Sequence, residues 1–171
     1  GFLNASKVEL AEETVQQSKD TVKKVGEEGM VLLKNDGLLP LGEDVKTLNV
    51  FGWASTNPLF GGTGSGSSDS SAAVGILQSL KDAGYETNDG LSGMYREYRT
   101  DRPTIAMASQ DWTIPEPPVS CYNDDLMAAT HEFSDMAVLV IGRSGGEGAD
   151  LPTDMKAVID GTYNPAATVS A

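Results

Sequence analysis

Hydrophobic residues recur at helical spacing near the start of the chain. One face carries apolar residues and the other is polar, which is typical of an amphipathic helix. Ser6 followed by Glu9 fits a capping box, and Asn35 to Gly37 (Asn-Asp-Gly) is a turn signal. This part of the chain therefore predicts a helix whose end packs on the core, followed by a turn. The apolar positions are Val8, Ala11, Val15, Val22 and Val25.

A strand, a helix and a second strand follow in the hydrophobic pattern. Val45 to Phe51 reads as a strand, Ser71 to Ala83 as a helix that stops at Gly84, and Gly84 to Asn88 as a short strand. Such a unit is typical of a parallel sheet with a right-handed crossover. The apolar face of the expected helix holds Val74, Leu77 and Leu80.

The second half of the chain is less regular. Leu91 to Tyr98 suits a helix, and the proline-rich Arg99 to Ser120 suits an extended excursion. Asp124 to Phe133 predicts a helix with Asn123 as its cap, whereas residues 151–171 show no clear periodicity. Three residues of that helix are expected to be buried, namely Leu126, Met127 and Phe133.

The most hydrophobic strand signal is Ala137 to Ile141, which is uninterrupted by any polar residue. This pattern suits a strand of a parallel sheet that is buried on both faces. A glycine-rich turn follows, with Glu147 between Gly146 and Gly148. Because ligands bind beyond the carboxyl ends of such strands, Glu147 is a candidate acid/base; the alternative is a solvated loop residue.

Charge and composition narrow the possible partners. Lys and Arg number 12 against 25 Asp and Glu, so the net charge is −13. This balance argues against nucleic acid and anionic membranes as partners, and a neutral sugar is compatible with it. With one cysteine, Cys121, and one histidine, His131, the chain offers no intrachain disulfide and no zinc ligand set. No cofactor is expected.

The loop from Gly61 to Asp69 invites comparison with phosphate-binding turns because it is rich in glycine. A dinucleotide fingerprint that starts at Gly62 would need glycine at its sixth position, which is Ser67. A P-loop needs a lysine, and none occurs between Lys46 and Lys81. A nucleotide-binding domain is therefore disfavoured.

The same loop could instead approach a sugar closely. It is rich in hydroxyl groups, and Trp53 and Phe60 lie just before it as possible stacking surfaces. The alternative interpretation is a plain surface linker.

Four motifs together resemble a known enzyme family. Residues 27–41 (EEGMVLLKNDGLLPL), the strand 48–52 (LNVFG), the loop 61–66 (GGTGSG) and the turn 142–150 (GRSGGEGAD) resemble landmarks of family 3 glycoside hydrolases, in the family's order. This family includes β-glucosidases and β-xylosidases. The resemblance implies an α/β domain, with a mostly parallel sheet flanked by helices, that forms part of an (α/β)6 sandwich.

The resemblance also implies roles for particular residues. Glu147 matches the family's acid/base glutamate, and Ser65 matches a loop serine that lines the sugar site in some members. Trp53 and Phe60 join Ser65 as candidate substrate-binding residues. The family often has Asp-Arg after the Glu-Gly pair, whereas here Leu151 follows Asp150, so no role is assigned to Asp150.

The implied organisation is that of an incomplete enzyme. Residues 1–26 would be a leading helix or linker, 27–150 a partial sandwich domain, and 151–171 an irregular tail or truncated insertion. The nucleophilic aspartate would lie on a (β/α)8 barrel of the parent protein, which no stretch of this chain resembles. A three-stranded sheet with an uncovered edge also favours an unfinished domain.

Retaining hydrolysis needs two carboxyl groups about 5–5.5 Å apart. The resemblance implies part of a retaining β-glycosidase that acts on a β-linked gluco- or xylo-oligosaccharide or an aryl glycoside, and because only one of the two carboxyl groups would lie on this chain, we expect it to be inactive alone. The pKa of Glu147 would have to be kept high by burial or by the partner carboxylate, whereas a contact with Arg143 would lower it. The alternative is a non-catalytic carbohydrate-binding or interaction module.

Overall fold

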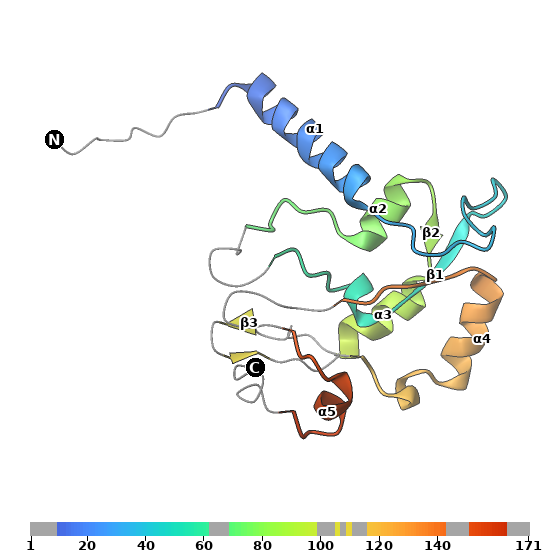
Figure 1. Ribbon diagram of the computed structural model, residues 1–171. Helices are drawn as coiled ribbons and strands as arrows, with labels where there is room; N and C mark the ends of the chain where they lie inside the picture. Colours follow the sequence, from blue (N-terminus) through green and yellow to red (C-terminus); the bar gives the residue numbers. More distant parts are fainter. Residues whose placement is uncertain are drawn as a thin grey trace. The chain divides into compact units, whose positions relative to one another are not determined.

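The computed structural model describes residues 10–61, 69–98, 105–106, 109–110, 116–142 and 151–163. The chain forms two compact units, Gly1–Gly42 and Glu43–Ala171, whose helices and strands are labelled in Figure 1. The domain limits expected from the sequence, after residues 26 and 150, stay predictions.

The first unit contains the helix α1 (Glu12–Gly29), which confirms the predicted helix. None of its residues is buried. Lys23 and Lys24 each lie four residues before a glutamate, with Nζ–Oε1 distances of 3.7 and 3.8 Å, a spacing that supports exposed helices modestly. Ser6, the predicted cap, lies outside the described residues. Packing of this helix on the core stays a prediction.

The predicted turn after α1 is built around the side chain of Asn35. Its Oδ1 accepts hydrogen bonds from the backbone N–H of Gly37 (3.2 Å) and of Leu39 (3.0 Å). Its Nδ2 donates to the carbonyl of Leu39 at 2.7 Å. Gly37 has a φ of +95°, which explains why glycine follows Asn-Asp here.

The second unit is built on a small parallel sheet. In the described ranges its strand order is β2 (Glu86–Thr87), β1 (Thr47–Phe51) and β5 (Ala137–Leu139), with β1 in the centre. Leu48 pairs with Thr87, and Phe51 pairs with Leu139. The predicted α/β class with a parallel sheet is confirmed.

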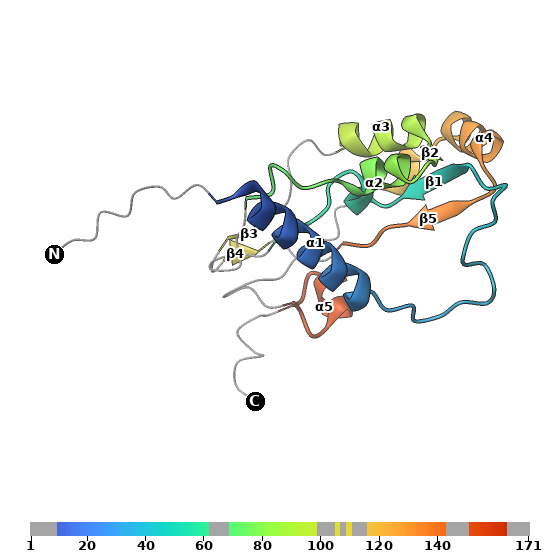
Figure 2. The same cartoon turned by 90° about the horizontal axis from the view of Figure 1, so that it is seen from above.

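Helices flank this sheet. α3 (Asp89–Tyr98) and α4 (Asp124–Phe133) both contact β1 and each other, and they lie on the same side of β1 and β5 (Figure 2). α2 (Ile76–Asp82) contacts β2. The predicted helices are therefore present, although α2 begins later than predicted and the apolar residues of α4 are less buried than predicted.

Helix α2 begins five residues later than predicted. The carboxylate of Asp69 accepts a hydrogen bond from the backbone N–H of Ser71 at 2.9 Å, and such local bonds compete with helix formation. Val74 consequently precedes the helix and is 58% exposed, whereas Leu77 is buried. The predicted stop at Gly84 is confirmed, with a φ of +91°.

Helix α4 has the predicted limits and the predicted cap. The Oδ1 of Asn123 accepts a hydrogen bond from the N–H of Leu126 at 2.9 Å. Its buried residue is the polar Thr130, and full burial of the three predicted apolar residues is wrong because each is only half-buried. Those residues are Leu126, Met127 and Phe133.

Thr130 belongs to a polar network that links β1 with α3 and α4. The side chain of Asn49, at 3% exposure in the middle of β1, donates to the carbonyls of Thr130 and Ser134, both at 2.8 Å. Asn88 donates to Asn49 Oδ1 at 2.9 Å and accepts from the N–H of Leu91 at 3.1 Å. The network thereby ties β1 to the start of α3 and to the end of α4.

The apolar core lies around β1 and α3. Leu48 and Val50 of β1 are 1% and 2% exposed. Beyond the strand, Trp53, Leu91 and Tyr95 form a buried cluster, with Phe51 and Leu126 among the residues packed against it. Burial of this kind supplies most of the stability of a small domain.

The prediction that Ala137 to Ile141 is buried on both faces is wrong. Leu139 is 67% exposed and Ile141 is 73% exposed. Within the described sheet, β5 is an edge strand that pairs only with β1. One row of its side chains therefore lacks the cover that a central strand receives.

Two further elements were missed by the sequence pattern. β3 (Ile105–Ala106) and β4 (Ser109–Gln110) form an antiparallel pair inside the segment predicted to be an extended excursion. α5 (Met155–Ile159) lies in the predicted irregular tail, with Asp154 as its cap. None of the described helices is long and apolar enough to cross a membrane.

Candidate functional site

The candidate site lies at the carboxyl edge of β1 and β5. Because the two strands are parallel neighbours, their carboxyl ends meet at the same edge, and the N–H of Val140 still bonds the carbonyl of Phe51 at 2.9 Å. From this edge the chain continues, in sequence, toward Ser65 after β1 and toward Glu147 after β5. Open α/β sheets bind their ligands at this position.

Two glycines allow the ends of these strands to approach closely. Gly52 has a φ of +96°, and a Cβ atom built there would lie 2.1 Å from the carbonyl oxygen of Val140. A Cβ at Gly142 would lie 2.7 Å from the Cβ of Ala54. A side chain at either position would push the two strand ends apart.

Two side chains hold the backbone at the end of β1. The N–H of Gly52 donates to the hydroxyl of Tyr95 at 2.8 Å, and the N–H of Trp53 donates to Oε1 of Glu116 at 2.8 Å. Tyr95 comes from α3 and is 1% exposed. The segment Gly52–Trp53 is called the β1 corner below.

A cavity of about 550 Å³ lies beside this corner. The residues with polar side chains in its lining are Glu116, Tyr95 and Tyr122, and the rest of its lining residues are apolar. Such an arrangement, a mostly apolar hollow with few polar groups, is typical of small-molecule sites. The apolar lining comes from Phe51, Leu139 and residues 140–142.

The two tyrosines in this cavity are directly linked. Their hydroxyls lie 2.8 Å apart, and their rings meet edge to face with centroids 6.3 Å apart. Burial and then the hydrogen bond with Tyr95 raise the pKa of Tyr122 above its ordinary value. Tyr122 therefore stays protonated at neutral pH and acts as a neutral hydrogen-bonding group.

The structure places only two of the four predicted site residues. Phe60 is 39% exposed, so its ring is accessible for stacking. Trp53 is 3% exposed inside the core cluster, and its Nε1 has no hydrogen-bond partner among the described residues. This burial favours a structural role for Trp53, and contact with a sugar stays a prediction.

Ser65 and Glu147 lie outside the described residues, as do Arg143 and Asp150. Their assigned roles therefore stay predictions. Asp69, the last residue of the glycine-rich loop from Gly61 to Asp69, is described. A hydrogen bond from the backbone N–H of Ser71 lowers the pKa of Asp69, which keeps this exposed carboxylate ionised.

Sequence reasoning missed the residues that build the β1 corner. Tyr95 reads as one apolar residue on a helix face, and Glu116 as one acid between Pro115 and Pro117. Both act on residues 43 and 63 positions away. The one local signal was Gly52, a glycine that directly follows a buried strand.

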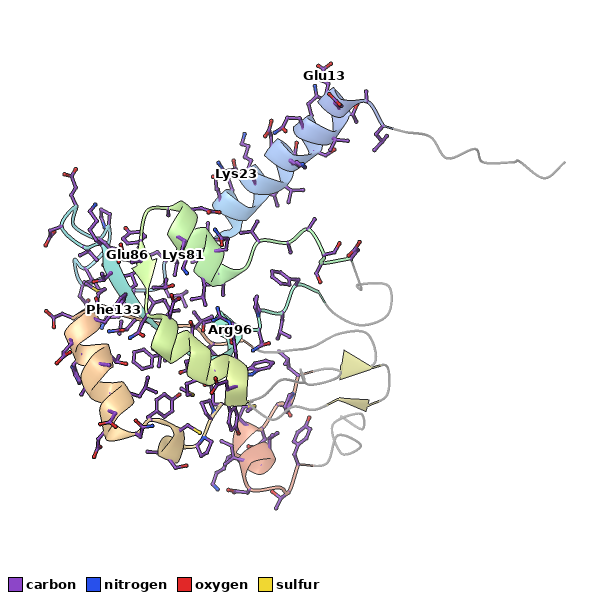
Figure 3. The ribbon with its side chains drawn as sticks, turned by 180° about the vertical axis from the view of Figure 1, so that it is seen from behind. Glu13, Lys23, Lys81, Glu86, Arg96 and Phe133 are labelled. Atoms are coloured by element: carbon purple, nitrogen blue, oxygen red, sulfur yellow. The ribbon has the colours of Figure 1, made fainter. Side chains whose placement is uncertain are left out.

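A second cavity, of about 730 Å³, lies beside β2 at the other edge of the sheet. Lys81, Glu86 and Phe133, which are labelled in Figure 3, belong to its lining. Lys81 Nζ lies 3.4 Å from the carboxylate of Asp89. Trp53 and Phe60, the two described candidates, are not among the residues that line this cavity. Across the described ranges, no group of three or more His, Cys, Asp or Glu side chains could hold a metal ion.

Comparison with known protein families gives a clear match. The model of the glycosyl hydrolase family 3 C-terminal domain matches residues 30–166. A β-glucosidase of Ruminococcus albus is 35% identical over 130 residues, which cover 74% of this chain and 13% of that protein. This chain therefore spans a small part of the relative it matches.

Comparison with solved structures agrees. The fold is similar to β-glucosidase 3B from Thermotoga neapolitana, solved in complex with α-D-glucose, with a TM-score of 0.62 and 28% identity. The match covers 81% of this chain and 20% of that one. The structure of the same enzyme in complex with glycerol gives a TM-score of 0.63 and 30% identity, over 81% of this chain and 19% of that chain.

Proposed function

Because this chain belongs to glycosyl hydrolase family 3, as its C-terminal domain, we propose that it supplies the acid/base residue of a retaining β-glucosidase. The assigned residue is Glu147. The observation that carries this proposal is the position of Glu147 in the chain, five residues after Gly142. Gly142 lies at the carboxyl edge of the sheet, where the ends of β5 and β1 meet.

The proposed reaction has two steps. In the first, Glu147 gives its proton to the glycosidic oxygen while a nucleophilic aspartate bonds to the anomeric carbon and the leaving group departs. In the second, Glu147 as a carboxylate takes a proton from water, whose oxygen bonds to the anomeric carbon and releases the aspartate. The aspartate belongs to a barrel domain outside this chain in our proposal.

The size of the relatives supports a further domain. This chain matches 13% of the Ruminococcus protein and 20% of the Thermotoga one, and no stretch of its sequence resembles a barrel with a second catalytic carboxyl. We therefore expect this chain alone to hydrolyse no aryl β-glucoside at a measurable rate. Glu147 by itself would provide only half of the required pair.

The proposed substrate is a terminal β-linked glucoside or xyloside, either an oligosaccharide or an aryl glycoside. Glucose in the Thermotoga structure supports the glucoside as first choice, and a neutral sugar is compatible with the chain's charge of −13. Ser65 would donate or accept hydrogen bonds with sugar hydroxyls. Phe60, as an accessible ring before the loop, would stack on the sugar.

The test compares Glu147→Ala with wild type in the parent open reading frame, on aryl β-glucosides with good and poor leaving groups. Loss of the proton donor should lower the rate of the first step by about 100-fold or more for substrates with poor leaving groups. For substrates with good leaving groups the rate of this step should fall far less. Glu132→Ala, at an exposed position of α4, is the matched control and should equal wild type. If Glu147→Ala also equals wild type, Glu147 is not the acid/base, and the binding-module alternative takes its place.

A further inference from the structure

The β1 corner joins two consecutive backbone amides to two distant side chains. The N–H of Gly52 reaches Tyr95, and the N–H of Trp53 reaches Glu116, each at 2.8 Å. Both partners come from segments that follow β2 in the chain. The corner is thus fixed by side chains and not by the sheet ladder alone.

These amides need partners because the corner is buried. Gly52 and Trp53 are both buried, and Trp53 is 3% exposed. After Phe51 the described chain leaves the ladder and turns into the short 3-10 helix η1 (Trp53–Ser55), so neither N–H continues the strand pairing. A buried N–H that loses its acceptor is costly, and the backbone would move to find another.

Any movement of the corner would be passed on to the end of β5. Gly52 lies against Val140, because a Cβ at Gly52 would come within 2.1 Å of the Val140 carbonyl oxygen. Gly142 lies against Ala54 in the same way, at 2.7 Å for its Cβ. Gly142 is the last described residue before the segment of the sequence that contains Glu147.

We propose that Tyr95 and Glu116 are positioning residues for the glycosidase reaction, because they hold the β1 corner against the end of β5, from which the chain continues in sequence to Glu147. This inference rests on the function proposed above for Glu147. Neither residue exchanges a proton with the substrate. Their task is to keep the acid/base close to the leaving oxygen, where displacements of about 1 Å can cost about 100-fold in rate.

The first measurement tests the corner without any enzymatic activity. Amide hydrogen exchange at Gly52 and Trp53 is measured by NMR in the 171-residue chain. Tyr95→Phe should speed exchange at Gly52 by roughly tenfold, because the ring stays and only the acceptor oxygen is lost. Tyr98→Phe, at a 41%-exposed position of the same helix, is the control and should leave that rate unchanged. Unchanged exchange at Gly52 in Tyr95→Phe would show that the Tyr95 hydroxyl does not hold the β1 corner.

The second measurement tests positioning in the parent open reading frame. Tyr95→Phe and Glu116→Ala should each lower kcat about tenfold on aryl β-glucosides with poor leaving groups, with KM changed less than about twofold. For substrates with good leaving groups, whose departure needs little protonation, the rate of the first step should be nearly unchanged. Glu116→Gln keeps an acceptor oxygen and should restore most of the loss. A role limited to stability would show neither the leaving-group dependence nor this rescue.

The outcomes separate the two proposals. If Glu147→Ala lacks its leaving-group dependence, the proposed function fails whatever the corner variants do. If Glu147→Ala has it and both corner variants match wild type on poor leaving groups, the positioning inference fails alone. Circular dichroism of Tyr95→Phe and Glu116→Ala establishes that each is folded, and either variant by itself suffices for the comparison.

Discussion

In β1, Leu48, Val50 and even the polar Asn49 are at most 3% exposed, whereas Leu139 and Ile141, in β5 and just after it, are 67% and 73% exposed. The two strands are parallel neighbours in register, and the sequence around β5 is the more hydrophobic. Between these two strands, exposure goes with position in the sheet and not with hydrophobicity. β1 has a strand on each side, and β5 has β1 on one side only in the described sheet.

The two strands nevertheless depend on each other at their carboxyl ends. The central strand turns at Gly52, and the edge strand passes directly against that turn. Glu147, the proposed acid/base, follows the edge strand in sequence, and the end of that strand lies against the turn of the central one. Substitutions in and around the two strands test this dependence.

The largest loss is expected for Gly52→Ala. The substitution places a side chain at a φ of +96° and within 2.1 Å of the Val140 carbonyl oxygen, so the pairing of β1 with β5 must open. We expect a loss of about 3 kcal/mol or more in the free energy of unfolding, measured with urea.

The matched control for this prediction is Gly93→Ala. Gly93 lies inside α3, and a Cβ there meets nothing within 4 Å. Alanine should stabilise the helix by about 0.5–1 kcal/mol. A loss in Gly52→Ala no larger than about 1 kcal/mol would contradict the close approach of the two strand ends.

The next effect compares leucines in the two strands. Leu48→Ala removes a side chain that is 1% exposed and should cost about 2–4 kcal/mol. Leu139→Ala removes one that is 67% exposed and should cost no more than about 0.5 kcal/mol. Thermal and urea unfolding of both variants measure the difference. Equal losses would mean that β5 is covered as fully as β1.

A smaller effect is expected for Asn49→Ala. The carbonyls of Thr130 and Ser134 would lose their bonds from the Asn49 amide, and Asn88 would lose the nearer of its two acceptors. Because these groups lie in or near the core, the loss should be about 1–3 kcal/mol. Hydrogen exchange in α4 should rise with it, and unchanged exchange there would argue against the network as a tie between β1 and α4.

The smallest effect is a pH dependence at Tyr122. Its pKa is raised in the folded chain, so it adds stability below the pKa of about 10 of an unfolded tyrosine, and this contribution is lost as the pH rises further. The free energy of unfolding of wild type should therefore fall more steeply above pH 10 than that of Tyr122→Phe. If the free energies of unfolding of the two proteins fall in parallel above pH 10, the pKa of Tyr122 is not raised by folding.

Features fixed by neighbouring residues could be predicted from the sequence. Asn123 caps α4 by a bond to Leu126 three residues on, and Gly84 ends α2 within one turn. The start of α2 was missed because Asp69 binds Ser71, a local bond that competes with the helical pattern. The exposure of Leu139 was missed because it depends on how many strands surround β5.

The candidate site likewise has features that could be predicted from neighbouring residues and features that depend on distant contacts. A site beyond the carboxyl end of the Ala137–Ile141 strand could be predicted from the hydrophobic run and the glycines after it, whereas the pairing of that strand with β1 appears only in the structure. Tyr95 and Glu116 could not be predicted, since their roles arise from contacts made across 43 and 63 residues. The glutamate assigned as acid/base was found through its resemblance to a family motif and through its position after a strand.

The role of Glu147 as the acid/base is tested most directly by azide rescue of Glu147→Ala in the parent open reading frame. Azide needs no general base, so it should attack the glycosyl-enzyme intermediate and restore turnover of an activated aryl β-glucoside. We expect β-glucosyl azide as the product, because the two displacements together retain the configuration. An α-glucosyl azide, or no rescue in a folded variant that remains slow, would contradict Glu147 as the acid/base.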